Sequence, residues 1–199
     1  MLKKVFSGMA AGLMVAMGGC VYMACDNKYA GAVLFSVALL TICIKGYSLY
    51  TGRIGYIVCD RSEEYLSALF LGLLGNTVAA VIAGLLARAA VPAIASAAET
   101  ACSAKLGQSL ISAFIRGSFC GVLMYTAVSI YKEAKNLSGI FFCIPVFILS
   151  GFEHSIADMF YFAAAGMFSV KVSFFILAVI LGNSVGAAVL PLLEGKGKK

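Results

Sequence analysis

The chain has 199 residues, of which 62% are hydrophobic and only 12% are charged, and its formal net charge at pH 7 is +6. Soluble domains are closer to half apolar and a quarter charged, so this composition excludes a soluble helical domain and predicts a polytopic all-α membrane protein. The basic excess has no surface of interleaved aromatic and basic side chains with it, which argues against nucleic-acid binding.

Apolar runs of about 18 or more residues predict membrane-spanning helices. In chain order, the runs are residues 5–23, 29–50 with 51–59 trailing, 65–87, 106–130, 137–170 and 172–193. The fifth run is too long for one plain span, and no stretch is left for a soluble domain. We therefore expect six transmembrane helices, two of them interrupted, in a single transmembrane domain of residues 1–199.

Basic side chains are distributed unevenly between the two sides of these spans. One side has Lys3, Lys4, Arg61, Lys132, Lys135, Lys196, Lys198 and Lys199, and the other has Lys28, Arg88, Lys105 and Lys171. Because cytoplasmic loops carry the excess of lysine and arginine, this bias of about two to one predicts that both termini are cytoplasmic. The expected location is the plasma or inner membrane of the cell.

The first 20 residues also have the basic start and apolar run of a signal peptide, even of a lipoprotein type ending at Cys20. We expect a structural span instead, because the internal repeat described next uses it as a unit. The seven cysteines form no C-x-x-C pair and mostly fall inside spans, so we interpret them as small apolar side chains. We predict no metal site and no cofactor.

Three pairs of motifs recur roughly 105 to 109 residues apart: LGNTVAA with LGNSVGA, GYSLYT with GFEHSI, and G-x-x-x-G in the first and fourth spans. They predict two repeats, at about residues 1–90 and 104–195, of three spans each. An odd number of spans inverts the second copy, and inverted repeats with broken helices are typical of transporters, whose substrate site lies where the breaks meet. Gly46, Gly52 and Gly151 are the expected helix-break glycines. Asn76 and Asn183 are expected at helix packing contacts, where their amides can bond the break backbone.

The segment GFEHSIADMF, residues 151–160, places three ionisable side chains in the middle of the fifth apolar run. Such side chains are costly in a bilayer and usually face a cavity that serves transport. His154 is the strongest candidate because imidazole titrates near neutral pH, although it can also simply tie two helices together. Asp158, one turn later, can pair with His154, which would favour the protonated imidazole. We interpret Glu153 as a structural acceptor for backbone amides or for Arg116.

Together these motifs resemble the formate/nitrite transporter family. GFEHSIADMFYFAAAG resembles the fifth-helix signature of that family, GYSLYTG its second-helix break, and LGNTVAA, FIRGSFCG and LGNSVGA its helices three, four and six in order. The resemblance implies an aquaporin-like homopentamer with one pore per protomer for small anions of weak acids: formate, nitrite, hydrosulfide or a short carboxylate. Asp158 and Gly121 stand where the family pattern has asparagine, so the motifs do not select one of these anions.

The resemblance also implies which residues line the pore. His154 and the Thr51 hydroxyl would lie between two apolar constrictions and hydrogen-bond or protonate the anion. Transport is proton-coupled in the second case, and the sequence does not select between a channel and a proton-coupled carrier. The constriction candidates are Phe35, Leu39, Leu49, Met124 and Phe147. Lys105 matches the basic vestibule residue, with Lys3 or Lys4 as its partner at the other mouth. The structural alternatives are helix capping for Thr51, a loop position for Lys105 and ordinary core packing for the constriction candidates.

Two other classes of protein would require sequence features that this chain lacks. An aquaporin-like channel for small neutral solutes is the main alternative, but it would carry N-P-A triplets, and none of Pro92, Pro145 and Pro191 follows an asparagine. A membrane redox or catalytic subunit would need paired haem ligands, a metal-spaced cysteine cluster or a nucleophile with its base, and the chain has one histidine. We therefore predict a transport protein and no enzyme.

Overall fold

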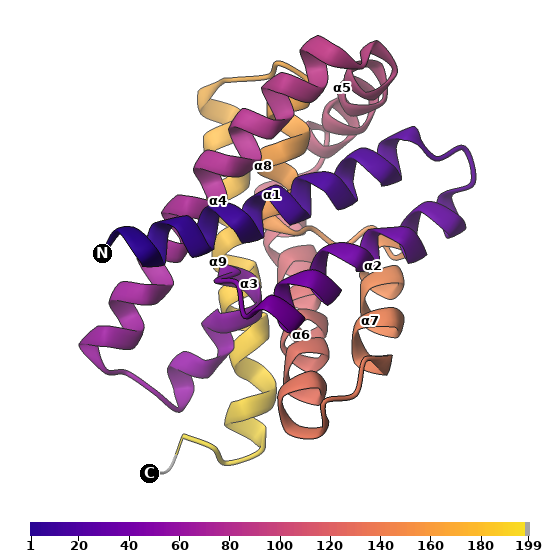
Figure 1. Ribbon diagram of the computed structural model, residues 1–199. Helices are drawn as coiled ribbons and strands as arrows, with labels where there is room; N and C mark the ends of the chain where they lie inside the picture. Colours follow the sequence, from indigo (N-terminus) through magenta and orange to yellow (C-terminus); the bar gives the residue numbers. More distant parts are fainter. Residues whose placement is uncertain (198–199) are drawn as a thin grey trace.

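The computed structural model describes residues 1–197, which form helices and short connections with no β-strand among them (Figure 1). Lys198 and Lys199, which contribute to the charge bias noted above, lie outside the described residues. The helices in chain order are α1 (Leu2–Ala24), α2 (Lys28–Lys45), α3 (Tyr50–Arg53), the 3₁₀ helix η1 (Ile54–Val58), α4 (Glu63–Ala90), α5 (Pro92–Leu106), α6 (Leu110–Ala134), α7 (Ser138–Leu149), α8 (Ser155–Ala164) and α9 (Val170–Leu193).

Five helices of the described chain are long and apolar enough to cross a membrane: α1, α2, α4, α6 and α9. Each corresponds to one of the predicted apolar runs. The long fifth run consists of two short helices in succession, α7 with 12 residues and α8 with 10. An all-helical membrane fold is therefore confirmed, with a pair of short helices where a single long span would otherwise be.

Polar side chains fix where several of these helices begin. The Asn27 side chain accepts hydrogen bonds from the backbone amides of Tyr29 and Ala30 at the start of α2. A serine oxygen caps the first turn of α4, α6 and α9 in the same way, from Ser62, Ser109 and Ser169. These residues satisfy amides that have no partner within the helix, which is why the chain turns into each span at that point.

Helix α5 was not expected from the sequence. The predicted fourth span began at residue 106, whereas the structure has α5 ending at Leu106 and α6 beginning at Leu110. The alanine-rich segment has Pro92 in its first turn and ends at Gly107, both of which are helix-boundary signals. A search for apolar runs misses it because Glu99, Lys105 and several small polar residues interrupt it.

The long helices pack in two close pairs, α1 with α4 and α6 with α9, and glycines permit the approach. A Cβ atom on Gly12 would collide with the Asn76 carbonyl oxygen, and one on Gly121 would collide with that of Asn183. The G-x-x-x-G motifs therefore serve contacts inside the protomer. Close backbone packing through small residues is how helices associate in lipid, where burial of apolar surface gives little driving force.

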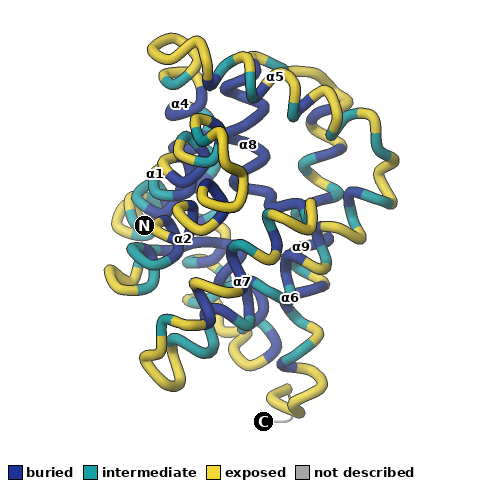
Figure 2. The backbone as a smooth tube through the Cα atoms, turned by 90° about the vertical axis from the view of Figure 1, so that its right-hand side faces the viewer, coloured by how far each residue is buried: buried dark blue, intermediate teal, exposed yellow. Residues whose placement is uncertain are grey.

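The short helices α3 and α8 lie inside this framework. Helix α8 packs against α1, α4 and α5, and α3 packs against α4, α6 and α9. Every residue of α8 is buried, and Figure 2 shows the buried backbone running along the interior while the outer turns are exposed. The exposed outer faces carry large apolar side chains, among them Phe6, Phe142, Phe174 and Leu181. Such a surface suits contact with lipid or with other protomers.

Candidate functional site

Two helix ends meet in the interior of the fold. Helix α2 ends in front of Gly46, with φ 71°, and α3 begins at Tyr50. Helix α7 ends at Leu149, Gly151 has φ 68°, and α8 begins at Ser155. Glycine takes this left-handed conformation without a steric penalty, so Gly46 and Gly151 fit the role expected of them. Gly52, the third expected break glycine, lies within α3 beside Val128.

Two asparagine side chains hold the non-helical segments between these ends. Asn76 accepts from the Tyr50 amide at 2.9 Å and donates to the carbonyl oxygens of Gly8 at 2.8 Å and Ser48 at 2.9 Å. Asn183 makes the corresponding set, each at 2.9 Å: the amide of Ser155 and the carbonyls of Gly117 and Glu153. The prediction that these amides bond the break backbone is confirmed. Unpaired backbone groups are very costly at this depth, so both asparagines are structural.

His154 and Thr51 meet where the two segments face each other. The His154 Nε2 atom lies 2.8 Å from the Thr51 Oγ1 atom, and Nδ1 accepts the Ala157 amide at 3.1 Å as the N-cap of α8. Because Nδ1 is the acceptor, a neutral ring carries its proton on Nε2 and donates it to Thr51. His154 is 4% exposed and Thr51 is fully buried. The Phe147 ring stacks on the imidazole with centroids 5.8 Å apart.

Lys105 brings together the two carboxylates on either side of His154. Its ammonium contacts Glu153 and lies 2.9 Å from Asp158 Oδ1. The Gln108 amide donates to the other oxygen of Glu153 at 2.7 Å. Burial disfavours the charged ammonium, but the adjacent Asp158 and Glu153 carboxylates outweigh it and raise the pKa of Lys105. Lys105 is thus a cation shared by two anions.

This arrangement differs from two expectations. Asp158 pairs with Lys105, not with the His154 ring, because its side chain points toward α5, a helix that was not foreseen. The Glu153 carboxylate bonds Lys105 and Gln108, whereas Arg116 donates to the Gly151 carbonyl at 3.3 Å. Gln108 was missed, since nothing in its own sequence context distinguishes it. The other oxygen of Asp158, Oδ2, is buried and has no hydrogen-bond partner within residues 1–197.

Three cavities follow one another through the interior. The first, of about 290 Å³ and here named the α5 vestibule, is lined by Lys105, Gln108, Arg116, Glu153, His154 and Asp158 among others. The second, the α3 vestibule of about 250 Å³, is lined by residues that include Leu39, Ile42, Leu49, Arg53, Tyr131 and Lys132. Between them a central cavity of only about 10 Å³ shares Leu39, Ile42 and Leu49 with the α3 vestibule, and Phe147 and His154 with the α5 vestibule.

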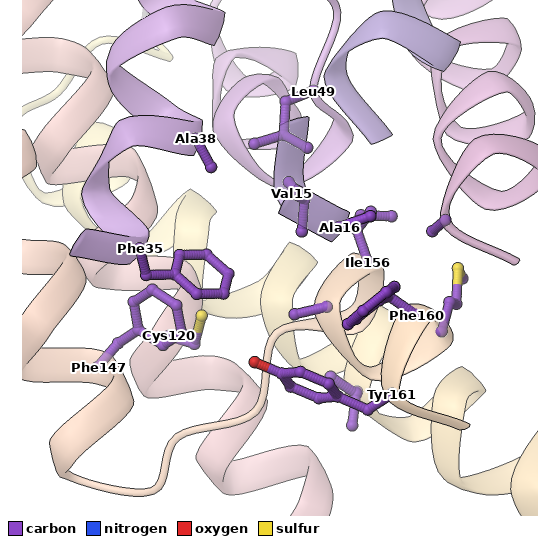
Figure 3. Close-up of a cluster of buried hydrophobic side chains, with 14 of the residues drawn as sticks. Val15, Ala16, Phe35, Ala38, Leu49, Cys120, Phe147, Ile156, Phe160 and Tyr161 are labelled. Carbon is purple, nitrogen blue, oxygen red and sulfur yellow. The ribbon is translucent and has the colours of Figure 1, made fainter. Parts of the chain in front are cut away.

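All five expected constriction residues line the central cavity: Phe35, Leu39, Leu49, Met124 and Phe147. Figure 3 shows Phe35 and Phe147 beside each other, with Leu49 and Val15 pointing toward the same cluster. The two phenylalanine rings meet edge to face, with centroids 6.2 Å apart. Thr51 does not line any of the three cavities, but it is hydrogen-bonded to His154, which lines two of them.

The basic residues of the α3 vestibule were not those expected. Arg53 donates to the Ser48 hydroxyl at 2.8 Å, and the Lys132 ammonium lies 3.6 Å from the centre of the Tyr56 ring. No carboxylate appears among the described residues that line this vestibule. Lys4 bonds the Glu64 carbonyl and is not part of the lining, nor is Lys3. The position of Arg53, two residues after Thr51 in the break motif, is the signal that could have identified it.

Within the described chain, no three His, Cys, Asp or Glu side chains come together in an arrangement that could hold a metal ion. The site's chemistry therefore derives from a ring with one exchangeable proton, an ammonium with two carboxylates, and apolar walls. Such a set can attract, desolvate and hydrogen-bond a small ion.

Comparisons of the sequence and of the fold with known proteins point to the same family. A sequence model described as formate/nitrite transporter matches residues 1–193. The chain is 28% identical over 179 residues to the uncharacterized transporter YwcJ of Bacillus subtilis, covering 81% of this chain and 70% of YwcJ. It is 27% identical over 175 residues to the nitrite transporter NirC of Escherichia coli, covering 78% of this chain but only 65% of NirC. The solved structure of a pentameric formate channel with formate bound has the same fold, with a TM-score of 0.82 at 22% identity over 98% of this chain and 95% of that one.

Proposed function

Because the chain belongs to the formate/nitrite transporter family, we propose that it forms a transmembrane channel or transporter for small monovalent anions of weak acids. Formate, nitrite, hydrosulfide and short carboxylates are the candidate substrates. The named relatives are transporters, and the solved structure is a channel, which supports transport and not catalysis.

One observation carries the proposal: His154 is the polar group at the boundary between the central cavity and the α5 vestibule. A bare ion crosses an apolar constriction only at high cost, so an anion needs a hydrogen-bond donor where its hydration shell is removed. The Nε2–H of His154 is such a donor. Thr51 is the acceptor that holds this proton in place until an anion competes for it.

The path that we propose begins at either vestibule. Arg53 and Lys132 attract the anion in the α3 vestibule, which has no carboxylate among its described lining residues, whereas Lys105 and Arg116 share the α5 vestibule with Glu153 and Asp158. From the α3 side, the anion then passes between Leu39 and Leu49. From the α5 side, it passes Phe147. In the central cavity it accepts the His154 proton as a hydrogen bond, or takes it and leaves as the neutral acid.

The membrane arrangement is part of the proposal. We take α7 and α8 together as one crossing, which makes six with the five long helices, and α2 with α3 as the matching interrupted segment. Both termini would be cytoplasmic, in the plasma or inner membrane. The pentameric state of the formate channel neighbour and the apolar outer faces of this chain support a homopentamer with one pore per protomer.

The test is a transport assay on purified protein in liposomes. Formate, nitrite and hydrosulfide are presented in turn, with glycerol as the neutral solute and protein-free liposomes as the control. We expect at least one of the three anions to pass far faster than through the control membrane. Liposomes that pass glycerol but none of the anions would refute the proposal and favour a channel for neutral solutes.

A further inference from the structure

The α5 vestibule has more carboxylates than its buried cation can balance. Lys105 contacts both Glu153 and Asp158, so the three side chains together carry one negative charge when all are ionised. Arg116, which is exposed and bonded to the Gly151 carbonyl, brings the whole vestibule to zero. An anion arriving from this side therefore meets no net attraction unless one carboxylate is neutral.

Asp158 is the carboxylate that is free to take a proton. Both oxygens of Glu153 are bonded, one to Lys105 and one to Gln108. Asp158 contacts Lys105 through Oδ1, while its Oδ2 has no hydrogen-bond partner among residues 1–197 although the residue is only 1% exposed. An ionised oxygen buried without a donor is unfavourable. A proton there removes the charge from this buried oxygen and converts it to an O–H donor.

His154 does not hold that proton in this conformation. Its Nδ1 accepts the Ala157 amide at the start of α8, so a second proton on the ring would break the cap. It would also place a cation at a helix N-terminus, where the backbone dipole opposes positive charge.

The other titratable groups near Asp158 do not compete for the role. The remaining groups that line the vestibule or lie close to Asp158 are Cys102 on α5, Cys120 on α6, Tyr22 on α1 and Tyr161 on α8. None of the four is a carboxylate, and an uncharged thiol or phenol adds nothing to the charge balance of the vestibule.

We propose that Asp158 is a proton-binding residue of the α5 vestibule, and that an anion is admitted from that side when Asp158 is protonated. The carboxylate takes one proton from a hydronium ion in the vestibule, whose O–H bond breaks to leave water, and becomes a neutral carboxylic acid. The vestibule then carries one net positive charge, from Lys105, Arg116 and the ionised Glu153. This inference rests on the proposed function, because it specifies how the same pore admits its substrate.

The test compares Asp158→Asn with the parent in the liposome assay across a range of pH. Asparagine has the shape of the protonated acid, can keep its oxygen on Lys105 and cannot ionise. Bulk protonation of the substrate is the same for both proteins, so the ratio of their fluxes isolates the residue. We expect a ratio near one at acid pH that rises to about tenfold as the pH increases, as removal of one unit charge near a partly hydrated ion predicts.

The matched control is Glu99→Gln, which neutralises a carboxylate on α5 that is paired with Arg88 at the surface. Its flux ratio to the parent should not change with pH. A constant ratio for Asp158→Asn over the whole range would overturn the inference. If neither protein passes any anion, the proposed function fails instead.

A second measurement does not depend on transport or on the variant. Infrared spectra of the detergent-solubilised parent, with and without isotope-labelled aspartate, report protonated aspartic acid by its carbonyl stretch. The chain has three aspartates, and the other two, Asp26 and Asp60, are exposed. We expect a label-sensitive band that persists to a pH at which exposed aspartates are ionised. Its absence would overturn the inference whatever the flux shows.

Discussion

Replacing Asn183 by alanine should destabilise the fold, because this one side chain bonds two backbone groups of the break before α8 and one carbonyl of α6. The variant removes three hydrogen bonds in a fully buried position. It leaves the Ser155 amide and the Glu153 carbonyl without these partners, whereas the Gly117 carbonyl keeps its partner within α6. Each hydrogen bond between membrane helices adds only modestly to the free energy of unfolding, so we take about 0.6–1 kcal/mol for each bond. The expected loss for the three is about 2–3 kcal/mol.

Thermal unfolding of the purified protein in detergent measures this loss. A chain of this size loses about 2–4 °C in Tm per kcal/mol, so the apparent Tm should fall by about 4–12 °C. Because membrane proteins often unfold irreversibly, parent and variant must be heated at the same rate.

Thr126→Ala is the matched control. Its hydroxyl bonds the Val122 carbonyl of its own helix, which keeps its helical partner when the hydroxyl is removed. The Tm of this variant should stay within about 2 °C of the parent. Asn76→Ala should match Asn183→Ala, since Asn76 makes the corresponding three bonds. A Tm for Asn183→Ala that equals that of Thr126→Ala would refute the reasoning.

Three further predictions concern the pore and the assembly. Thr51→Val should fold normally but lower anion flux about tenfold, because valine cannot accept a hydrogen bond from His154. Thr51→Ser should keep most of the flux. Equal fluxes for the valine and serine variants in the liposome assay would contradict this. The His154→Asn variant should still cap α8 and assemble, which size-exclusion chromatography would show. The pH dependence of its flux should differ from that of the parent, because the asparagine side chain does not titrate. A flux that follows the parent at every pH would exclude the ring as a proton-coupled element. Light scattering with the detergent contribution subtracted should give a protein mass about five times 20.8 kDa, and a transport-competent monomer or trimer would argue against the pentamer.

Much of the framework follows from local patterns in the sequence. Apolar runs locate the spans because a bilayer requires a fixed length of apolar helix. The glycines at 46 and 151 and the repeated Leu-Gly-Asn motif locate the ends of α2 and α7 and the amides that hold them. In each case the backbone geometry or an unpaired backbone group requires a particular residue type. The position of that residue type in the sequence therefore reveals the structural feature.

The electrostatic part of the site could not be predicted in the same way. Whether Asp158 pairs with His154 or with Lys105 depends on where α5 lies, and α5 has neither the length nor the hydropathy of a span. Lys105 and Glu153 are 48 residues apart in the chain, and Gln108 and Glu153 are 45 apart. Only the packing of α5 on α8 brings them together. The tautomer of His154 likewise depends on its position as a helix cap, which spacing does not reveal.

The two halves of the chain share a scaffold and differ in chemistry. Asn76 bonds the backbone of Ser48 and Tyr50, and Asn183 bonds that of Glu153 and Ser155, so residues paired by the proposed repeat make the same contacts.

On this scaffold, Leu49 and His154 occupy equivalent positions as the N-caps of α3 and α8. Leu49 makes no side-chain cap and contributes an apolar wall of the central cavity, whereas His154 caps its helix and contributes a proton donor. One residue later in the proposed repeat, Tyr50 corresponds to Ser155, and Thr51 then corresponds to Ile156. The hydroxyl that bonds the Nε2 atom of the imidazole therefore comes from the opposite half. The matching backbone contacts fix where α3 and α8 begin, and the difference between Leu49 and His154 gives the junction an apolar wall on one side and a hydrogen-bonding imidazole on the other. The proposed pore would use this asymmetry as its one hydrogen-bonding centre.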